Sequence, residues 1–163
     1  ILPDGFVIEG LNDSKKLTEK KREKLFDIII ENAICYSIAS ASVEEIEEIN
    51  ILNAAMLAMN RAVNSLEIKP DLALIDGNTS RGFEIETKTV VGGDAISPSI
   101  AAASILAKVY RDRLMLKLAE VYPEYHFEKH KGYGTKEHIE ALKKFGKCKI
   151  HRNSFIGKFI KND

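Results

Sequence analysis

The sequence has few cysteines, no long apolar run and no excess of charge of either sign. Its 2 cysteines, Cys35 and Cys148, are too few for a disulfide framework and fit no metal spacing. We therefore expect a reducing, cytoplasmic compartment. No apolar run approaches the roughly 18 residues of a membrane span, and the first residues lack the charged-then-apolar pattern of a leader. We expect no membrane partner.

The composition is that of an ordinary globular chain. Hydrophobic residues make up 45% and charged residues 29% of the 163 positions, which argues against a disordered protein. A chain of this length forms one domain that buries about 68–70% of the surface its unfolded form exposes. We therefore predict a single domain over residues 1–163.

The net charge of zero conceals an uneven distribution. Residues 1–107 carry 10 Lys and Arg against 17 Asp and Glu, a net of −7, whereas residues 108–163 carry 14 against 7, a net of +7. Such an asymmetry indicates a basic binding face beside an acidic region. A solvated pair of basic helices would give the same count.

Apolar spacing and turn signals predict strands and helices that alternate along the chain. Helices are expected over 18–31 with Thr18 as cap, from the capping box Ser42 and Glu45 to before Pro70, from Ser97 to about Glu120, and from Thr135 to Gly146. Strands are expected over 34–41, 71–76 and 84–91, the second covered on both faces because it is almost continuously apolar. The class is α/β or α+β, with helices packed on a sheet.

Two aspartates follow predicted strands. Asp76 ends the apolar strand, where open sheets place ligands, although Asp76-Gly77 is also an ordinary turn pair. Asp94 follows two glycines before a helix start and can equally be a loop residue near a cap. Together, carboxylates at neighbouring strand ends are typical ligands of Mg²⁺ or Mn²⁺, and paired metals can hydrolyse a phosphodiester.

Residues 122–138 interleave aromatics with His and Lys. A hydrophobic plug explains Tyr125 and Phe127 but explains Lys131 and Tyr133 less well, because aromatic faces and cations together are typical of nucleic-acid contacts.

Two shorter polar segments are weaker candidates. Ser14 and Lys15, in a loop before a helix, could hold a phosphate or form a solvated turn. Near the end of the chain, His151 and Arg152 could contact a backbone phosphate or simply lie on the surface.

Six segments in order resemble the type 2 ribonucleases H, in particular the bacterial ribonuclease HII branch. The segments are LNDSKKL (11–17), INILNAAMLAM (49–59), LIDGN (74–78), GGD with SIAAASILAKVYRD (92–94 and 99–112), HKGYGT (130–135) and HRNSF (151–155). They extend over almost the whole chain.

The resemblance implies an α/β, ribonuclease H-like mixed sheet flanked by helices. It implies an endonuclease that uses Mg²⁺ or Mn²⁺ to cleave the RNA of RNA–DNA hybrids and to incise at ribonucleotides embedded in DNA, as in ribonucleotide excision repair, leaving a 3′-hydroxyl and a 5′-phosphate. Asp76 and Asp94 match the third and fourth catalytic carboxylates, which are metal ligands. Tyr133 matches the tyrosine at the ribonucleotide junction, and Ser14 and Lys15 match a loop near the backbone.

The remaining expectations concern the substrate-binding part and the oligomeric state. The basic part 122–163, with Lys131, His151 and Arg152, would hold the nucleic acid, and the protein would act as a monomer. Asp112 lies in a matching segment, but we interpret it as a helix-surface partner of Arg111 or Arg113.

One departure from the family pattern is large. The family's first strand carries an Asp-Glu-x-Gly-Arg-Gly motif with two more carboxylates and the 2′-hydroxyl sensor, and this sequence contains no such motif. Neither Asp4 nor Glu9 has the context to replace it. We therefore expect an N-terminally incomplete member, inactive as a 163-residue chain. The alternative is a non-catalytic nucleic-acid-binding module, which would leave LIDGN and GGD unexplained.

Overall fold

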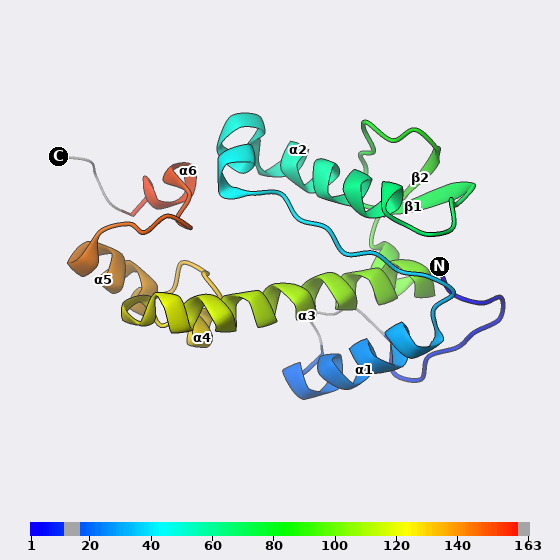
Figure 1. The fold of residues 1–163 in the computed structure, drawn as a ribbon, viewed down its shortest axis with the longest axis horizontal. Coiled ribbons are helices and arrows are strands. Elements are labelled where there is room, and N and C mark those ends of the chain that lie inside the picture. Colours follow the sequence, from blue (N-terminus) through cyan, green and yellow to red (C-terminus); the bar gives the residue numbers. More distant parts are fainter. Residues whose placement is uncertain (12–16, 160–163) are drawn as a thin grey trace. The chain divides into compact units, whose positions relative to one another are not determined.

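The structure is a computed structural model that describes residues 1–11 and 17–159 (Figure 1). The chain divides into two compact units. Unit 1 comprises residues 1–40 and 55–110, and unit 2 comprises residues 41–54 and 111–163. Each unit has its own apolar cluster. The single domain expected from the chain length stays a prediction.

Unit 1 contains a parallel pair of strands, β1 (Leu72–Asp76) and β2 (Glu86–Val90). Their register runs from Leu72 opposite Glu86 to Asp76 opposite Val90, and the Gly77 N–H continues the ladder by donating to the Val90 carbonyl at 3.0 Å. The strands predicted over 71–76 and 84–91 are confirmed. Because the pair is parallel, both carboxyl ends lie at one edge.

Only one face of β1 is covered within the described part of the chain. Ala73 and Ile75 are buried, whereas Leu72 is 43% and Leu74 37% exposed. The expectation of cover on both faces is therefore wrong. Side chains alternate along a strand, so the two leucines lie on the face opposite to the buried pair.

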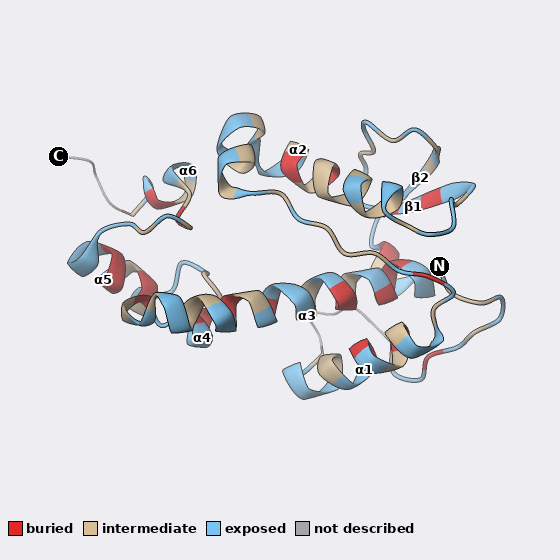
Figure 2. Ribbon diagram, in the orientation of Figure 1, coloured by how far each residue is buried: buried red, intermediate tan, exposed pale blue. Residues whose placement is uncertain are grey.

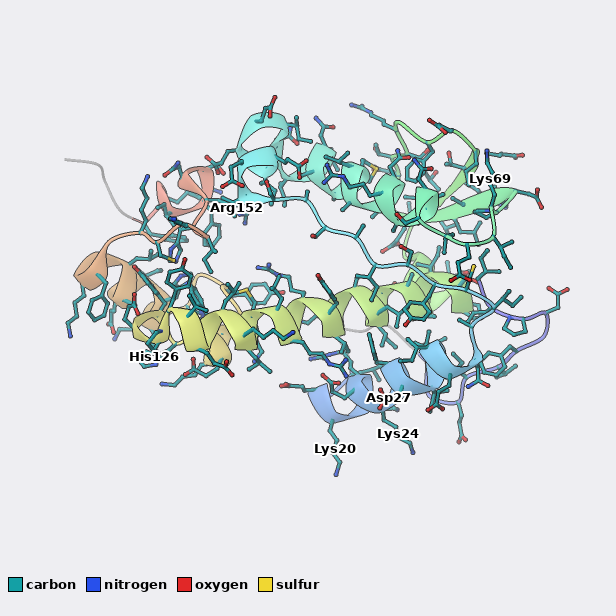
Figure 3. The ribbon with its side chains drawn as sticks, in the orientation of Figure 1. Lys20, Lys24, Asp27, Lys69, His126 and Arg152 are labelled. Atoms are coloured by element: carbon teal, nitrogen blue, oxygen red, sulfur yellow. The ribbon has the colours of Figure 1, made fainter. Side chains whose placement is uncertain are left out.

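Two helices, together with Ile8, form the apolar cluster of unit 1. Helix α1 (Glu19–Asn32) is capped by Thr18, which accepts from the Lys21 N–H at 3.3 Å. It packs on the first half of α3 (Pro98–Val121), and the buried faces of the two helices are visible in Figure 2. Lys20 and Lys24 project from the outer side of α1 (Figure 3). Both predicted helices are confirmed, and their shared cluster consists of Ile8, Leu25, Phe26, Ile29, Ala102, Ile105, Leu106 and Val109.

The sequence predicts one continuous helix after Ser42, but the helix in the structure is broken. The capping box is present: the Ser42 N–H donates to Glu45 Oε2 at 2.8 Å, and the Glu45 N–H donates to Ser42 Oγ at 3.2 Å. However, α2 (Val43–Asn64) is broken at Asn50, which has φ 67° and ψ 166°. The Asn50 side chain accepts from the Leu52 and Asn53 N–H groups at 3.0 and 3.1 Å. Asn50 thus caps a second helical segment, which explains the break.

The strand predicted over residues 34–41 is wrong. None of its residues is in a strand, and its first two residues bond to the first residue of the chain. The Ile34 N–H donates to the Ile1 carbonyl, and the Ile1 ammonium donates to the Cys35 carbonyl, both at 2.8 Å. Alternating residues favour an extended backbone, but a strand also requires a partner along its length.

Besides residues 41–54 and the second half of α3, unit 2 contains short elements that follow α3. They are the 3₁₀ turn η3 (Pro123–Tyr125), α4 (Phe127–His130), α5 (Lys136–Phe145) and α6 (Asn153–Ile156). The predicted bounds of α5 are confirmed, with Thr135 as N-cap and Gly146 as C-cap. The apolar cluster consists of Met115, Tyr125, Phe127, Ala141, Leu142 and Ile156. Among the helices of the described residues, none is long and apolar enough to cross a membrane.

Candidate functional site

The two predicted metal ligands lie at the carboxyl edge of the strand pair in unit 1. Asp76 is the last residue of β1 and is exposed, and Asp94 is half-buried in the 3₁₀ turn η2 (Gly93–Ala95). The Gly93 N–H donates to Asp76 Oδ1 at 2.9 Å. Because Gly93 directly precedes Asp94, this bond ties the two carboxylate-bearing segments together.

Two glycines allow this approach. Gly92 has φ +65°, a left-handed conformation that glycine adopts without steric cost. At Gly93, a Cβ atom would lie 2.5 Å from Ile100 Cδ1 and 3.3 Å from Val90 Cβ. The glycine pair therefore both turns the chain and leaves room for the Gly93 N–H to reach the Asp76 carboxylate.

The two carboxylates fit part of a divalent-cation site. Carboxylate oxygens are the ligands that Mg²⁺ and Mn²⁺ prefer. Within residues 1–11 and 17–159, no three His, Cys, Asp or Glu side chains gather in a way that could hold a metal ion. Asp76 and Asp94 could therefore supply two ligands, and the remaining ligands would come from water, the substrate or other protein groups.

The surface position that the sequence suggested for Asp112 is wrong. Asp112 is 4% exposed. The reason is its position on α3: Val109 and Met115, three residues to either side, are also buried, and residues three apart share a helix face.

Unit 2 presents Tyr133 on a loop in which the backbone N–H and carbonyl of Tyr133 are both hydrogen-bonded. Tyr133 is 64% exposed. The Tyr133 N–H donates to the His130 carbonyl at 2.9 Å, and the Tyr133 carbonyl accepts from the Thr135 N–H at 2.8 Å. Nδ1 of His138 lies 2.9 Å from the same carbonyl. The loop therefore holds the backbone of Tyr133 in place while its side chain faces outward.

Of the remaining predicted nucleic-acid contacts, the structure describes Lys131 and Arg152. Lys131 has a left-handed backbone, with φ 51°, and its Nζ donates to the Glu128 carbonyl at 2.6 Å. Arg152, labelled in Figure 3, is half-buried. Its guanidinium lies 5.3 Å from the centre of the Phe155 ring. Ser14 and Lys15 lie outside the described residues.

His151 is an interior residue, so the surface position suggested by the sequence is wrong. It is 7% exposed. Its ring lies 4.8 Å from that of Tyr125 and 5.5 Å from that of Phe127 between centroids. Tyr125 and Phe127 are themselves buried, as the plug interpretation predicted.

Sequence reasoning also missed that His130 and His138 are buried. The two rings stack with 4.5 Å between centroids, and both meet Phe127 edge to face. For His138 the sequence contains a signal: Ala141 and Leu142, three and four residues later, form the apolar face of α5. Burial lowers the pKa of His138, and burial together with the neighbouring His138 lowers the pKa of His151 to about 4.

The fold is that of a ribonuclease H-like nuclease, as a solved structure shows. The crystal structure of the ribonuclease H2 from Pyrococcus horikoshii OT3 matches with a TM-score of 0.73 and 28% identity, covering 94% of this chain and 83% of that one. The predicted α/β class is thus confirmed.

Sequence comparison defines the family. A family model for ribonuclease HII matches residues 6–158. The ribonuclease HII of Endomicrobium trichonymphae is 60% identical over 95% of this chain and 74% of its own length. That of Idiomarina loihiensis is 59% identical over 95% of this chain and 83% of its own. The chain belongs to the ribonuclease HII family, which consists of endoribonucleases.

Proposed function

We propose that this chain carries two of the metal-binding carboxylates and the nucleic-acid-binding part of an endonuclease that acts on RNA–DNA hybrids and on ribonucleotides embedded in duplex DNA. The observation that carries the proposal is the hydrogen bond from the Gly93 N–H to Asp76 Oδ1. It joins the end of β1 to the turn that carries Asp94, at the edge where parallel sheets bind ligands.

Asp76 and Asp94 would hold Mg²⁺ or Mn²⁺. When bound, such ions lower the pKa of a water molecule and stabilise the leaving oxygen of a phosphodiester. The protein's own contribution is to orient the two carboxylates. Gly92 and Gly93 bring the second segment to the first, and the bond to Oδ1 fixes the rotation of the Asp76 carboxylate.

The basic part of the chain, residues 122–163, would hold the substrate. It contains 10 Lys and Arg against 5 Asp and Glu. Lys131 and Arg152 would contact phosphates, and Tyr133 would stack on a sugar or base. Such contacts read shape, phosphates and the 2′-hydroxyl and need no base-specific bonds. His151 is left out of this set because its ring is buried.

A titration with Mn²⁺ tests the metal site without depending on cleavage. Calorimetry should show binding to the unchanged chain and its loss in Asp76→Asn. Asp71→Asn is the matched control, because Asp71 is an exposed carboxylate directly before the amino end of the same strand. Equal Mn²⁺ binding in the two variants would contradict the site.

The same titration separates this proposal from a non-catalytic binding module. A module would bind an RNA–DNA hybrid without any Mn²⁺ site that depends on Asp76 or Asp94. Salt dependence alone does not separate them, since phosphate contacts give a slope of roughly −0.9 per contact in either case.

A further inference from the structure

Two buried histidines in unit 2, His130 and His138, contact the loop that carries Tyr133, and a third, His151, contacts His138. Each is 7% exposed or less. All three have ring nitrogens at hydrogen-bond distance from backbone groups, and a backbone N–H can only donate while a carbonyl can only accept. The backbone therefore determines where each imidazole proton lies.

The proton of His130 is on Nε2. The Gly132 N–H donates to His130 Nδ1 at 3.2 Å, so Nδ1 must offer its lone pair. Nε2 lies 2.8 Å from the Tyr125 carbonyl, which requires a donor. A neutral ring protonated at Nε2 satisfies both contacts.

His138 and His151 share one proton between their Nε2 atoms, which lie 3.0 Å apart. The Cys148 N–H donates to His151 Nδ1 at 3.0 Å, so the His151 proton is on Nε2. Nδ1 of His138 faces the Tyr133 carbonyl at 2.9 Å, so the His138 proton is on Nδ1 and its Nε2 accepts from His151. The Cys148 thiol, 3.0 Å from His151 Nδ1, can donate as well.

This arrangement is consistent only when both rings are neutral. A second proton on His151 would place an N–H against the Cys148 N–H. A second proton on His138 would place two N–H groups face to face. The chain of bonds thus runs in one direction, from Cys148 through His151 and His138 to the Tyr133 carbonyl.

The end of that chain is the backbone of an exposed aromatic residue. We propose that His138, oriented by His151, is a positioning residue that holds the Tyr133 backbone so that the exposed ring is presented to the nucleic acid. The inference rests on the proposed function through the role of Tyr133. Pre-ordering a contact residue reduces the entropy lost on binding.

The tautomers can be observed directly, whatever the function. Long-range ¹H–¹⁵N spectra of the unchanged chain at pH 7 should show His138 protonated at Nδ1 and His130 and His151 at Nε2. The exposed His126 supplies a reference signal. Protonation of His138 at Nε2, or of both its nitrogens, would overturn the proposal.

Two substitutions of His138 separate its two nitrogens. Asparagine places an amide nitrogen near the position of Nδ1 and so keeps a donor toward Tyr133. Glutamine instead reaches toward His151 and removes that donor. Binding of an RNA–DNA hybrid is measured by fluorescence anisotropy in EDTA, which prevents cleavage.

We expect Tyr133→Ala to weaken hybrid binding about tenfold, as loss of one stacking contact does. His138→Gln should weaken it about threefold or more, the effect of one lost hydrogen bond, while His138→Asn stays within about twofold of the unchanged chain. In the double variant, His138→Gln should add nothing to Tyr133→Ala, because it acts through Tyr133.

The binding results separate a failure of the proposed Tyr133 contact from a failure of the positioning role of His138. Unchanged binding in Tyr133→Ala would contradict the proposed contact. Weakened binding in Tyr133→Ala with normal binding in His138→Gln, or additive losses in the double variant, would overturn the positioning role alone. Variants are compared where their far-UV circular dichroism matches the unchanged chain. If His138→Gln does not reach the circular dichroism signal of the unchanged chain, the ¹H–¹⁵N spectrum of the unchanged chain tests the positioning role of His138.

Discussion

The two units of this chain prepare their functional groups in opposite ways. In unit 1, Asp76 is exposed at the end of a strand, and only one hydrogen bond to its carboxylate, from the Gly93 N–H, is described. In unit 2, the ring nitrogens of the three histidines are bonded inside the structure, and the residue they support, Tyr133, faces outward. Under the two proposed roles, the difference separates a group that would bind a ligand from groups that would position another residue.

That contrast has a physical basis. A metal ligand must keep an oxygen available, so it lies at an edge and takes its orientation from the backbone. A positioning residue is buried, and a buried polar ring is stable only when its donors and acceptors are satisfied. Exposure and hydrogen bonding therefore distinguish the two roles better than residue type does.

The largest expected effect contrasts two aromatic residues of unit 2. Phe127 is 1% exposed and contacts Tyr125 and all three buried histidines, so Phe127→Ala should lower the free energy of unfolding by about 3–5 kcal/mol. Tyr133→Ala should change it by less than about 1 kcal/mol, because that side chain is 64% exposed. Urea denaturation measures both. Equal losses would remove the distinction between a core ring and a presented ring.

The second prediction concerns pH. The pKa of His151 is lowered from 6.5 to about 4, so between those values the unfolded chain binds a proton at this histidine that the folded chain does not. Stability should be full above pH 6.5 and fall toward pH 4, at a slope approaching about 1.4 kcal/mol per pH unit for His151. The lowered pKa of His138 acts in the same direction. The groups facing His151 are His138, His130 and Cys148.

Carboxylates affect the pH dependence of stability only at the acid end of this range. Contacts with Ser154 lower the pKa of Glu47, and the ion pair with Lys129 lowers that of Glu137, from ordinary values of 4.5. Their stabilisation is lost below about pH 4.5, so the region from pH 6.5 to 5 reports the histidines. His151→Gln should flatten that region. An unchanged slope in this variant would contradict the neutral pair.

The third prediction tests the glycine of unit 1. Gly93→Ala should lower the free energy of unfolding by about 1–3 kcal/mol, because the new Cβ would lie 2.5 Å from Ile100 Cδ1. Ile100→Val removes that atom, so in its background the additional cost of Gly93→Ala should largely disappear. Thermal denaturation of the four chains measures the coupling. Strict additivity would show that steric contact with Ile100 is not the reason for glycine.

Local signals made much of the fold predictable. Thr18, Ser42 with Glu45, and Thr135 cap the helices that they were expected to cap, because a cap depends on bonds within a few residues. Residues 34–41 and Asn50 were not predictable in this way. Residues 34–41 would need a distant partner to become a strand. Asn50 is a polar residue within an apolar repeat that is otherwise helical.

The positions of the two aspartates were predictable to the same extent, while their role as metal ligands stays a prediction. Asp76 and Asp94 carry their context with them: an apolar strand before one and two glycines before the other. The histidines do not, because His130, His138 and His151 become neighbours only through the packing around Phe127. From the sequence alone, a histidine beside lysines or arginines indicates a phosphate contact. Only burial shows that it belongs to the core.

The division of roles between the units is tested most directly by cleavage and binding measured together in the full-length protein. Asp76→Asn should reduce the Mn²⁺-dependent cleavage of an RNA–DNA hybrid at least about a hundredfold, since bound metals supply several kcal/mol to the transition state. Its affinity for the hybrid in EDTA should stay within about twofold of the unchanged protein. Retained cleavage in Asp76→Asn would contradict the account.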